Sequence, residues 1–157
     1  MFLGREKTKG FFLDENVMET AASQTLASLS VTTVRSVRQV VASLSGGQRQ
    51  AVAVAKAVMW NSQLVIMDEP TAALGVAQTA MVLELTRRLA ERGLGVIFVS
   101  HNFNDIFEVA DQIAVLYLGR LVASIPAADL DRQMVVDLVT SGTTTRTLPG
   151  AIKPNGA

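Results

Sequence analysis

Apolar residues recur along this chain at three- and four-residue spacing in three places, and this spacing predicts three amphipathic helices. The first begins near Glu15 with Asp14 as its N-cap, the second covers residues 46–59, and the third covers residues 77–92 and is capped by Gly93. The side chains expected to be buried are Met18, Ala21, Ala22, Thr25, Leu26 and Leu29 in the first helix, Ala51, Val54, Ala55 and Val58 in the second, and Met81, Val82, Leu85 and Leu89 in the third.

Two short runs of apolar residues, 64–67 and 96–99, predict strands that follow the second and third helices. Neither run contains a polar residue, which is typical of parallel strands that are covered on both faces. The alternation of helix and strand therefore predicts an α/β fold, with flanking helices on a partial parallel sheet.

The two ends of the chain show different patterns. Residues 1–43 carry no strand-like run and are expected to form part of a helical subdomain, which the main domain follows over residues 44–142. The main domain is predicted to finish with a short helix after Asn102, a hairpin of residues 113–117 and 121–124, and a helix over residues 131–141. Residues 143–157, with a threonine run, two prolines and two glycines, are predicted to be a flexible tail.

Composition narrows the functions that fit. The 157 residues suggest one domain, and 14 basic and 14 acidic residues cancel, so the overall charge gives no sign of a nucleic-acid partner. The absence of cysteine excludes disulfides and thiolate metal ligands, and it suits a cytoplasmic location. The apolar-rich stretches without charge, such as residues 57–67, are shorter than the roughly 18 residues of a membrane span. The charges at residues 5–7 argue against a secretion signal.

Residues 44–48, Leu-Ser-Gly-Gly-Gln, lead into the second predicted helix and are candidates for a phosphate site. In isolation, Ser45 followed by Gly46 and Gly47 is most simply a helix N-cap with a tight turn. A helix N-terminus with two residues that lack side chains also lets backbone N–H groups, a serine hydroxyl and the helix dipole converge on a phosphate. The five-residue string should occur by chance on the order of once in a million positions at average residue usage, which favours the phosphate site.

Asp68 and Glu69 directly follow the first predicted strand, and His101, the only histidine, comes shortly after the second. Acidic residues at strand ends are often only solvated terminators, and a lone histidine is more often a capping or surface residue. Ligands of open α/β sheets nevertheless bind at the carboxyl ends of the strands, where we expect all three side chains. There, one aspartate is enough to help hold Mg²⁺, and a glutamate within hydrogen-bond reach of a water can act as a general base.

The order of these elements resembles the C-terminal part of the ATP-binding subunits of ABC transporters. The resemblance covers residues 1–142 and implies a P-loop-NTPase-like fold, in which residues 44–48 are the signature motif, residues 64–69 are Walker B with its catalytic glutamate, and His101 is the switch histidine. It implies that Ser45, Gly46 and Gly47, supported by Gln48, contact the γ-phosphate of an ATP held on the opposing subunit. It further implies that Asp68 holds Mg²⁺ through water, that Glu69 polarises the attacking water, and that His101 reaches the γ-phosphate.

The same resemblance implies the partners and the location. These are a second ATP-binding domain and transmembrane permease subunits, with this protein on the inner face of the cell membrane and with no membrane span of its own. Residues 2–6, 10–14 and 101–111 are similar to the sugar-importing branch of the family. The implied activity is ATP hydrolysis coupled to the import of a sugar.

Two departures from the family pattern change this picture. No segment has the Walker A form G-x-x-x-x-G-K-[ST], so the sequence is expected to be a fragment that is inactive alone. Gly75 also stands where the family usually has an aspartate that couples the two ATP sites. Two alternatives stay open: a non-catalytic truncated subunit that acts as an interaction module, and, more remotely, a DNA-repair-type ABC ATPase. The lack of coiled-coil heptads and of a basic stripe argues against the DNA-repair type.

Overall fold

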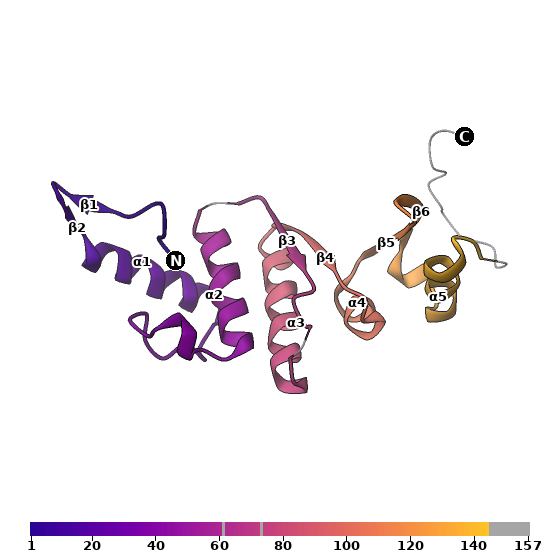
Figure 1. Cartoon of the computed structure of the whole chain (residues 1–157), viewed down its shortest axis with the longest axis horizontal. Helices are drawn as coiled ribbons and strands as arrows, with labels where there is room; N and C mark the ends of the chain where they lie inside the picture. The colour runs from indigo at the N-terminus through magenta and orange to yellow at the C-terminus, as the bar shows by residue number, and fades with distance from the viewer. Residues whose placement is uncertain (61, 73, 145–157) are drawn as a thin grey trace. The chain divides into compact units, whose positions relative to one another are not determined.

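A computed structural model describes residues 1–60, 62–72 and 74–144 of the chain (Figure 1). The chain divides into two compact units, the first ending at Ser100 and the second beginning at His101. Each unit has its own hydrophobic core. The predicted α/β class is confirmed, since helices and a small parallel sheet occur together in the first unit.

The first unit combines an antiparallel hairpin, three α-helices and a parallel pair of strands. The hairpin is β1 (Thr8–Lys9) and β2 (Phe12–Leu13), and the helices are α1 (Glu15–Ser28), α2 (Gly46–Met59) and α3 (Val76–Glu91), with a short 3₁₀ turn at Val41–Ser43 before α2. The parallel pair is β3 (Leu64–Asp68) and β4 (Gly95–Val99). Helix α2 lies between α1 and α3 and contacts both (Figure 1).

All three predicted helices are confirmed, and so is most of their buried surface. Asp14 caps α1, with its side chain accepting a hydrogen bond from the backbone N–H of Val17 at 3.1 Å. The helices and the parallel strands share one core, formed by Leu26, Leu29, Val54, Ala55, Val65, Met67, Leu85 and Leu89. The prediction for Met81 was wrong, because its side chain is 40% exposed.

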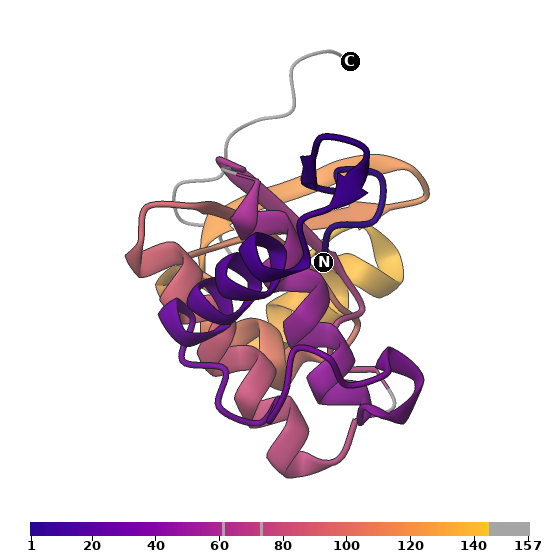
Figure 2. The same cartoon turned by 90° about the vertical axis from the view of Figure 1, so that its left-hand side faces the viewer.

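The hairpin β1–β2 contradicts the prediction that residues 1–43 contain no strand. Its two strands pair Thr8 with Leu13 and Lys9 with Phe12, and Gly10 turns the chain between them at a φ of +65°. A positive φ is readily adopted by glycine, which explains how so short a turn can form here. The hairpin projects from the helices of the first unit (Figure 1 and Figure 2).

The parallel pair corrects a second prediction, that the strands are covered on both faces. Successive side chains of a strand point to opposite faces of a sheet. Val65 and Met67 are buried against the helices, whereas Leu64, Ile66, Ile97 and Val99 are 51%, 65%, 46% and 46% exposed. One face of this sheet is therefore covered by the helices, and the other carries exposed aliphatic side chains.

The second unit packs two helices on an antiparallel hairpin. Helix α4 (Phe103–Val109) is followed by β5 (Gln112–Tyr117), β6 (Arg120–Pro126), a 3₁₀ turn at Ala127–Asp129 and helix α5 (Arg132–Ser141), close to the predicted bounds. Leu118 and Gly119 make the tight turn at φ values of +46° and +77°, as two-residue hairpin loops require. The predicted tail, residues 143–157, lies outside the described residues except for Thr143 and Thr144. None of the helices in the described part of the chain is long and apolar enough to cross a membrane.

The one-sided sheet predicts unequal effects for two neighbouring substitutions in β3. Val65→Thr places a hydroxyl in the core and should lower the free energy of unfolding by about 1–3 kcal/mol, whereas Ile66→Thr on the exposed face should change it by less than about 0.5 kcal/mol. Both variants keep a β-branched side chain, so strand propensity is matched. Urea denaturation followed by the fluorescence of Trp60 measures both. Equal losses would show that both faces of the sheet are covered.

Candidate functional site

Residues 44–48, which we call the signature segment, lead into α2, and two of them are joined by a reciprocal pair of hydrogen bonds at its N-terminus. Ser45 is the N-cap, and its Oγ accepts from the backbone N–H of Gln48 at 3.3 Å, while Gln48 Oε1 accepts from the backbone N–H of Ser45 at 2.8 Å. This reciprocal pair is a capping box. Because the Ser45 hydroxyl acts as an acceptor in it, the hydroxyl hydrogen can still be donated to a ligand oxygen.

Gln48 also ties the signature segment to the stretch of chain that follows α1. Its Nε2 donates to the carbonyl oxygen of Thr33 at 2.6 Å. One side chain therefore fixes both the start of α2 and a loop 15 residues away in sequence. This arrangement agrees with the supporting role that the resemblance implies for Gln48, a role that stays a prediction.

The two glycines of the segment lie against the start of α3. A Cβ added at Gly46 would come within 2.8 Å of Leu74 Cδ2, and one at Gly47 would lie 3.3 Å from Gln78 Cβ. The backbone N–H of Gly75 in turn donates to Gln78 Oε1 at 3.2 Å. Gln78 stands in no distinguishing motif and is not among the predicted site residues, although a glutamine three residues after a helix N-cap is a weak signal for capping.

The predicted carboxylates lie at the carboxyl end of the parallel pair. Asp68 is the last residue of β3, opposite Val99, and its side chain is exposed. Glu69 continues the pairing, since its backbone N–H donates to the Val99 carbonyl at 2.8 Å, and its side chain is half-buried. The φ of Glu69 is +46°. Such left-handed backbone is uncommon for a residue of this type, and it occurs in tight turns, as at Leu118, and at sites where function constrains the chain.

The structure brings the signature segment and the carboxylates into one unit, connected through a short loop. Strand β3 ends at Asp68 and α3 begins at Val76, and between them Leu74 lies close to Gly46, where an added Cβ would come within 2.8 Å of its Cδ2. Pro70 and Thr71, directly after Glu69, are buried. A change in this loop can therefore affect both predicted elements.

His101 is the first residue of the second unit and is exposed. The parallel register places the ends of β3 and β4 at the same edge of the sheet, and the chain passes from that edge through Ser100 to His101. That the His101 side chain lies at the same sheet edge as Asp68 and Glu69 stays a prediction.

No cluster of three or more His, Cys, Asp or Glu side chains suited to a metal ion occurs in the described ranges. Asp68 alone is nevertheless compatible with Mg²⁺, which is often bound by one or two carboxylates together with phosphate oxygens and water. A magnesium ion at this edge would have to take its other ligands from a nucleotide and from water.

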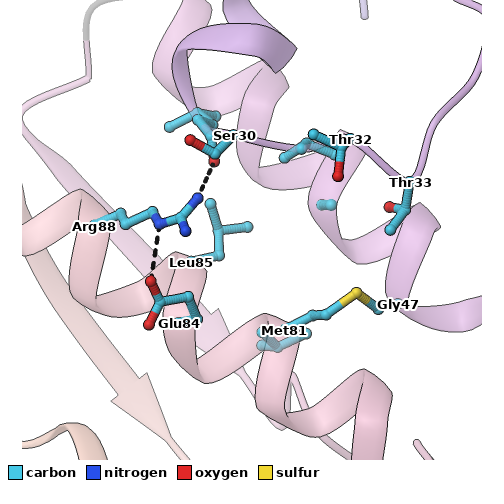
Figure 3. Close-up of a pocket in the computed structure, with 12 residues that line it drawn as sticks. Ser30, Thr32, Thr33, Gly47, Met81, Glu84, Leu85 and Arg88 are labelled. Atoms are coloured by element: carbon cyan, nitrogen blue, oxygen red, sulfur yellow. Dashed lines mark hydrogen bonds and ion pairs between the residues drawn. The ribbon is translucent and has the colours of Figure 1, made fainter.

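A small pocket lies beside the signature segment (Figure 3). It measures about 160 Å³ and is lined by residues that include Thr33, Gly47 and Met81. At one side, Arg88 binds Glu84 at 3.0 Å and the carbonyl oxygen of Leu29 at 3.4 Å. The pocket is smaller than the roughly 300–1,000 Å³ of most small-molecule sites, so we assign it no ligand.

The fold is similar to that of solved ATP-binding cassettes. A structure of an inward-facing metal-chelate type ABC transporter matches with a TM-score of 0.70 and 26% identity, over 88% of this chain and 53% of that one. An ATP-binding cassette of another ABC transporter matches with a TM-score of 0.67 over 87% of this chain and 52% of that one. At 22% identity the second likeness shows the fold alone.

Sequence comparison finds a similarity to the same kind of protein. Residues 5–72 match the ABC transporter family. The chain is 45% identical to the fructose import ATP-binding protein FrcA of Rhizobium meliloti, over 89% of this chain and 56% of the relative. It is 40% identical to the xylose/arabinose import ATP-binding protein XylG of Sulfolobus acidocaldarius, over 90% of this chain and 56% of the relative. The chain is similar to ABC transporter ATP-binding proteins, as the motifs predicted, and it spans about half the length of these two relatives.

The hydrogen bonds of Gln48 predict that it stabilises the signature segment. Gln48→Ala removes the bonds to Ser45 and Thr33 and should lower the free energy of unfolding by about 1–2 kcal/mol. It should also speed amide hydrogen exchange at residues 45–48. Gln50→Ala on the same helix is the matched control, and we expect a change of less than about 0.5 kcal/mol. Equal exchange rates in the two variants would contradict a supporting role for Gln48.

Proposed function

We propose that this chain supplies the signature and Walker B part of an ATP-hydrolysing subunit that powers import of a sugar. The observation that carries the proposal is that Ser45, Gly46 and Gly47 form the N-terminus of a helix. They lie in the same unit as a strand that ends at Asp68 and is followed by Glu69. The sugar-import proteins among the relatives support the choice of cargo class. ATP and Mg²⁺ are the proposed cofactors.

We assign each predicted site residue a role in binding or hydrolysing ATP. The backbone N–H groups of Gly46 and Gly47 and the Ser45 hydroxyl would bind the γ-phosphate of an ATP on the opposing subunit, because a helix N-terminus attracts anions. Asp68 would hold Mg²⁺ through water at the exposed edge of the sheet. Glu69 would accept a proton from the attacking water as general base, and His101 would reach the same phosphate.

The proposed assembly contains two ATP-binding domains under a membrane permease, at the inner face of the cell membrane. Gly75 lacks the carboxylate that the family usually places there, so contact between the two ATP sites at this position would rest on backbone groups alone. The division into residues 1–43 as a helical subdomain and residues 44–142 as part of the ATPase domain is proposed on the same basis.

A second candidate is a non-catalytic interaction module. The observation that favours it is the lack of a P-loop sequence in the 157 residues. The P-loop supplies the backbone cradle and the lysine that hold the β- and γ-phosphates. The two candidates differ in what the residues do once a P-loop is present, and the experiments below separate them.

The missing P-loop predicts that the isolated chain neither binds ATP with useful affinity nor hydrolyses it. The signature segment offers contacts to one outer phosphate only, and these cannot replace the P-loop cradle. Calorimetric titration of the purified chain with Mg-ATP should give no saturable heat, and phosphate release should equal that of a Glu69→Gln control. Micromolar binding by the isolated chain would show that the nucleotide site is elsewhere.

A chimera tests the role of Glu69 in an intact ATPase. Residues 1–142 replace the matching part of the Rhizobium meliloti fructose-import protein, which is 45% identical. In this chimera Glu69→Gln should retain ATP binding while hydrolysis falls by roughly 10²- to 10⁴-fold, because the general base is lost. Glu91→Gln, at the far end of α3, is the matched control and should leave turnover unchanged. Equal turnover in the Glu69→Gln variant and the parent chimera would remove Glu69 from the catalytic role, and a parent chimera that binds ATP without turnover would favour the interaction module.

A further inference from the structure

A hollow of about 460 Å³ lies at the C-terminal end of α2, in the first unit. Its size falls within the roughly 300–1,000 Å³ of most small-molecule sites. Two of the residues that line it, Arg5 and Lys56, are basic, and none of the lining residues that the structure describes is acidic. The other lining residues are Leu3, Gly4, Ala53, Ala57, Trp60 and Ser62. We call this hollow the Trp60 site.

The two cations of the Trp60 site are available to an anion. Arg5 Cζ lies 4.8 Å from the centroid of the Trp60 ring, and a guanidinium held over a ring keeps its N–H donors. Within the described ranges, neither the Arg5 nor the Lys56 side chain forms an ion pair or donates to a protein acceptor. Glu6 follows Arg5 in sequence, but its carboxylate accepts from the backbone N–H of Gly4 at 2.9 Å.

Trp60 contributes an apolar ring and a donor without a partner. Its indole Nε1 is buried and has no acceptor among the residues that the structure describes. Buried N–H groups are rarely left unsatisfied, so a water or a ligand oxygen is expected beside it. Phe2 packs on the ring edge to face, with 5.7 Å between the centroids. Ser62 differs, because its Oγ already donates to the Ala57 carbonyl at 2.9 Å.

The charge and the size of the Trp60 site favour an organic phosphate. A phosphate monoester carries a charge of about −1.5 to −2 at pH 7, which matches two cations, whereas a carboxylate carries one negative charge. Arginine and lysine are also common phosphate-binding side chains. A phosphate ion alone would fill only part of 460 Å³, and Leu3, Ala53 and Ala57 offer apolar contact to an attached organic group.

We propose that the Trp60 site binds a small organic phosphate, with its phosphoryl group on Arg5 and Lys56 and its organic group against Trp60 and the apolar lining. The site is separate from the phosphate site of the proposed function. The signature segment begins α2, whereas Trp60 ends it, and a helix of 14 residues is about 21 Å long.

Trp60 is the only tryptophan of the chain, so its fluorescence reports on this site directly. Titration of the purified chain with glucose 6-phosphate should change the emission saturably, with a Kd in the range of about 0.1–1 mM for so few polar contacts. Glucose, which lacks the phosphoryl group, should give no saturable change. Inorganic phosphate should bind more weakly because it leaves the apolar lining uncovered, and so should succinate, whose two charges lie on separate carboxylates.

Lysine variants test the contact with the phosphoryl group. Lys56→Gln should raise the Kd for glucose 6-phosphate by about tenfold or more, because one charge-assisted contact is lost, whereas Lys56→Arg keeps the charge and should retain most of the affinity. Lys9→Gln, in β1, is the matched control and should bind as the parent does. Circular dichroism checks that each variant is folded.

Several results would overturn the proposal. These are no saturable change with glucose 6-phosphate, saturable binding of glucose, tighter binding of succinate, or equal affinity in the Lys56→Gln variant and the parent. Inorganic phosphate that binds as tightly as glucose 6-phosphate would show an adventitious ion only.

A substitution in the signature segment separates this inference from the proposed function. Ser45→Ala should leave the binding of glucose 6-phosphate unchanged. Binding that is lost in Ser45→Ala but kept in Lys56→Gln would place the phosphate on the signature segment, which would overturn the Trp60 site and leave the proposed function standing. A chimera without ATP turnover would do the reverse, because the fluorescence titration requires no hydrolysis.

Discussion

The parallel pairing of β3 with β4 is the constraint on which the candidate site depends. It places Asp68 opposite Val99 and then holds the next backbone N–H, that of Glu69, against the Val99 carbonyl at 2.8 Å. Glu69 is thus fixed by the sheet on one side and by the following turn on the other, where the N–H of Ala72 donates to its carbonyl at 3.1 Å. These two hydrogen bonds hold the backbone from which the carboxylate projects.

This fixation explains how a glutamate can hold a φ of +46°. A non-glycine residue in this region costs on the order of 1–3 kcal/mol, and it persists only where the surroundings over-determine the backbone. Here the strand bond, the turn bond and the buried Pro70 and Thr71 supply that restraint. Glycine would adopt the same backbone with less strain. The presence of a carboxylate at a position that favours glycine is what chemical use of the side chain would require.

Most helices could be predicted from the sequence because their signals are local. Asp14, Ser45, Asn102 and Asp131 each begin a helix as side-chain caps, and the apolar spacing identifies the buried stripes. The sequence could not show which face of the sheet is buried. A run such as residues 64–67 is apolar at every position, so it lacks the alternation of polar and apolar residues that marks an exposed face. The contacts of Leu74 and Gln78 with the signature glycines were also out of reach, since they join segments about thirty residues apart whose meeting depends on helix packing.

The two parts of the candidate site differ in how far the first unit supports them. The signature segment has its cap, its tie to Thr33 and its seat on α3 within the first unit, so its backbone donors are ordered before any phosphate arrives. A ligand that meets such a segment does not have to order it, which favours binding, but a single helix N-terminus offers few contacts. The carboxylate edge, in contrast, shares its face with exposed aliphatic side chains. In the proposed function, affinity for a nucleotide and a dry setting for hydrolysis would therefore both depend on what covers that face, whereas the geometry of the signature segment would not.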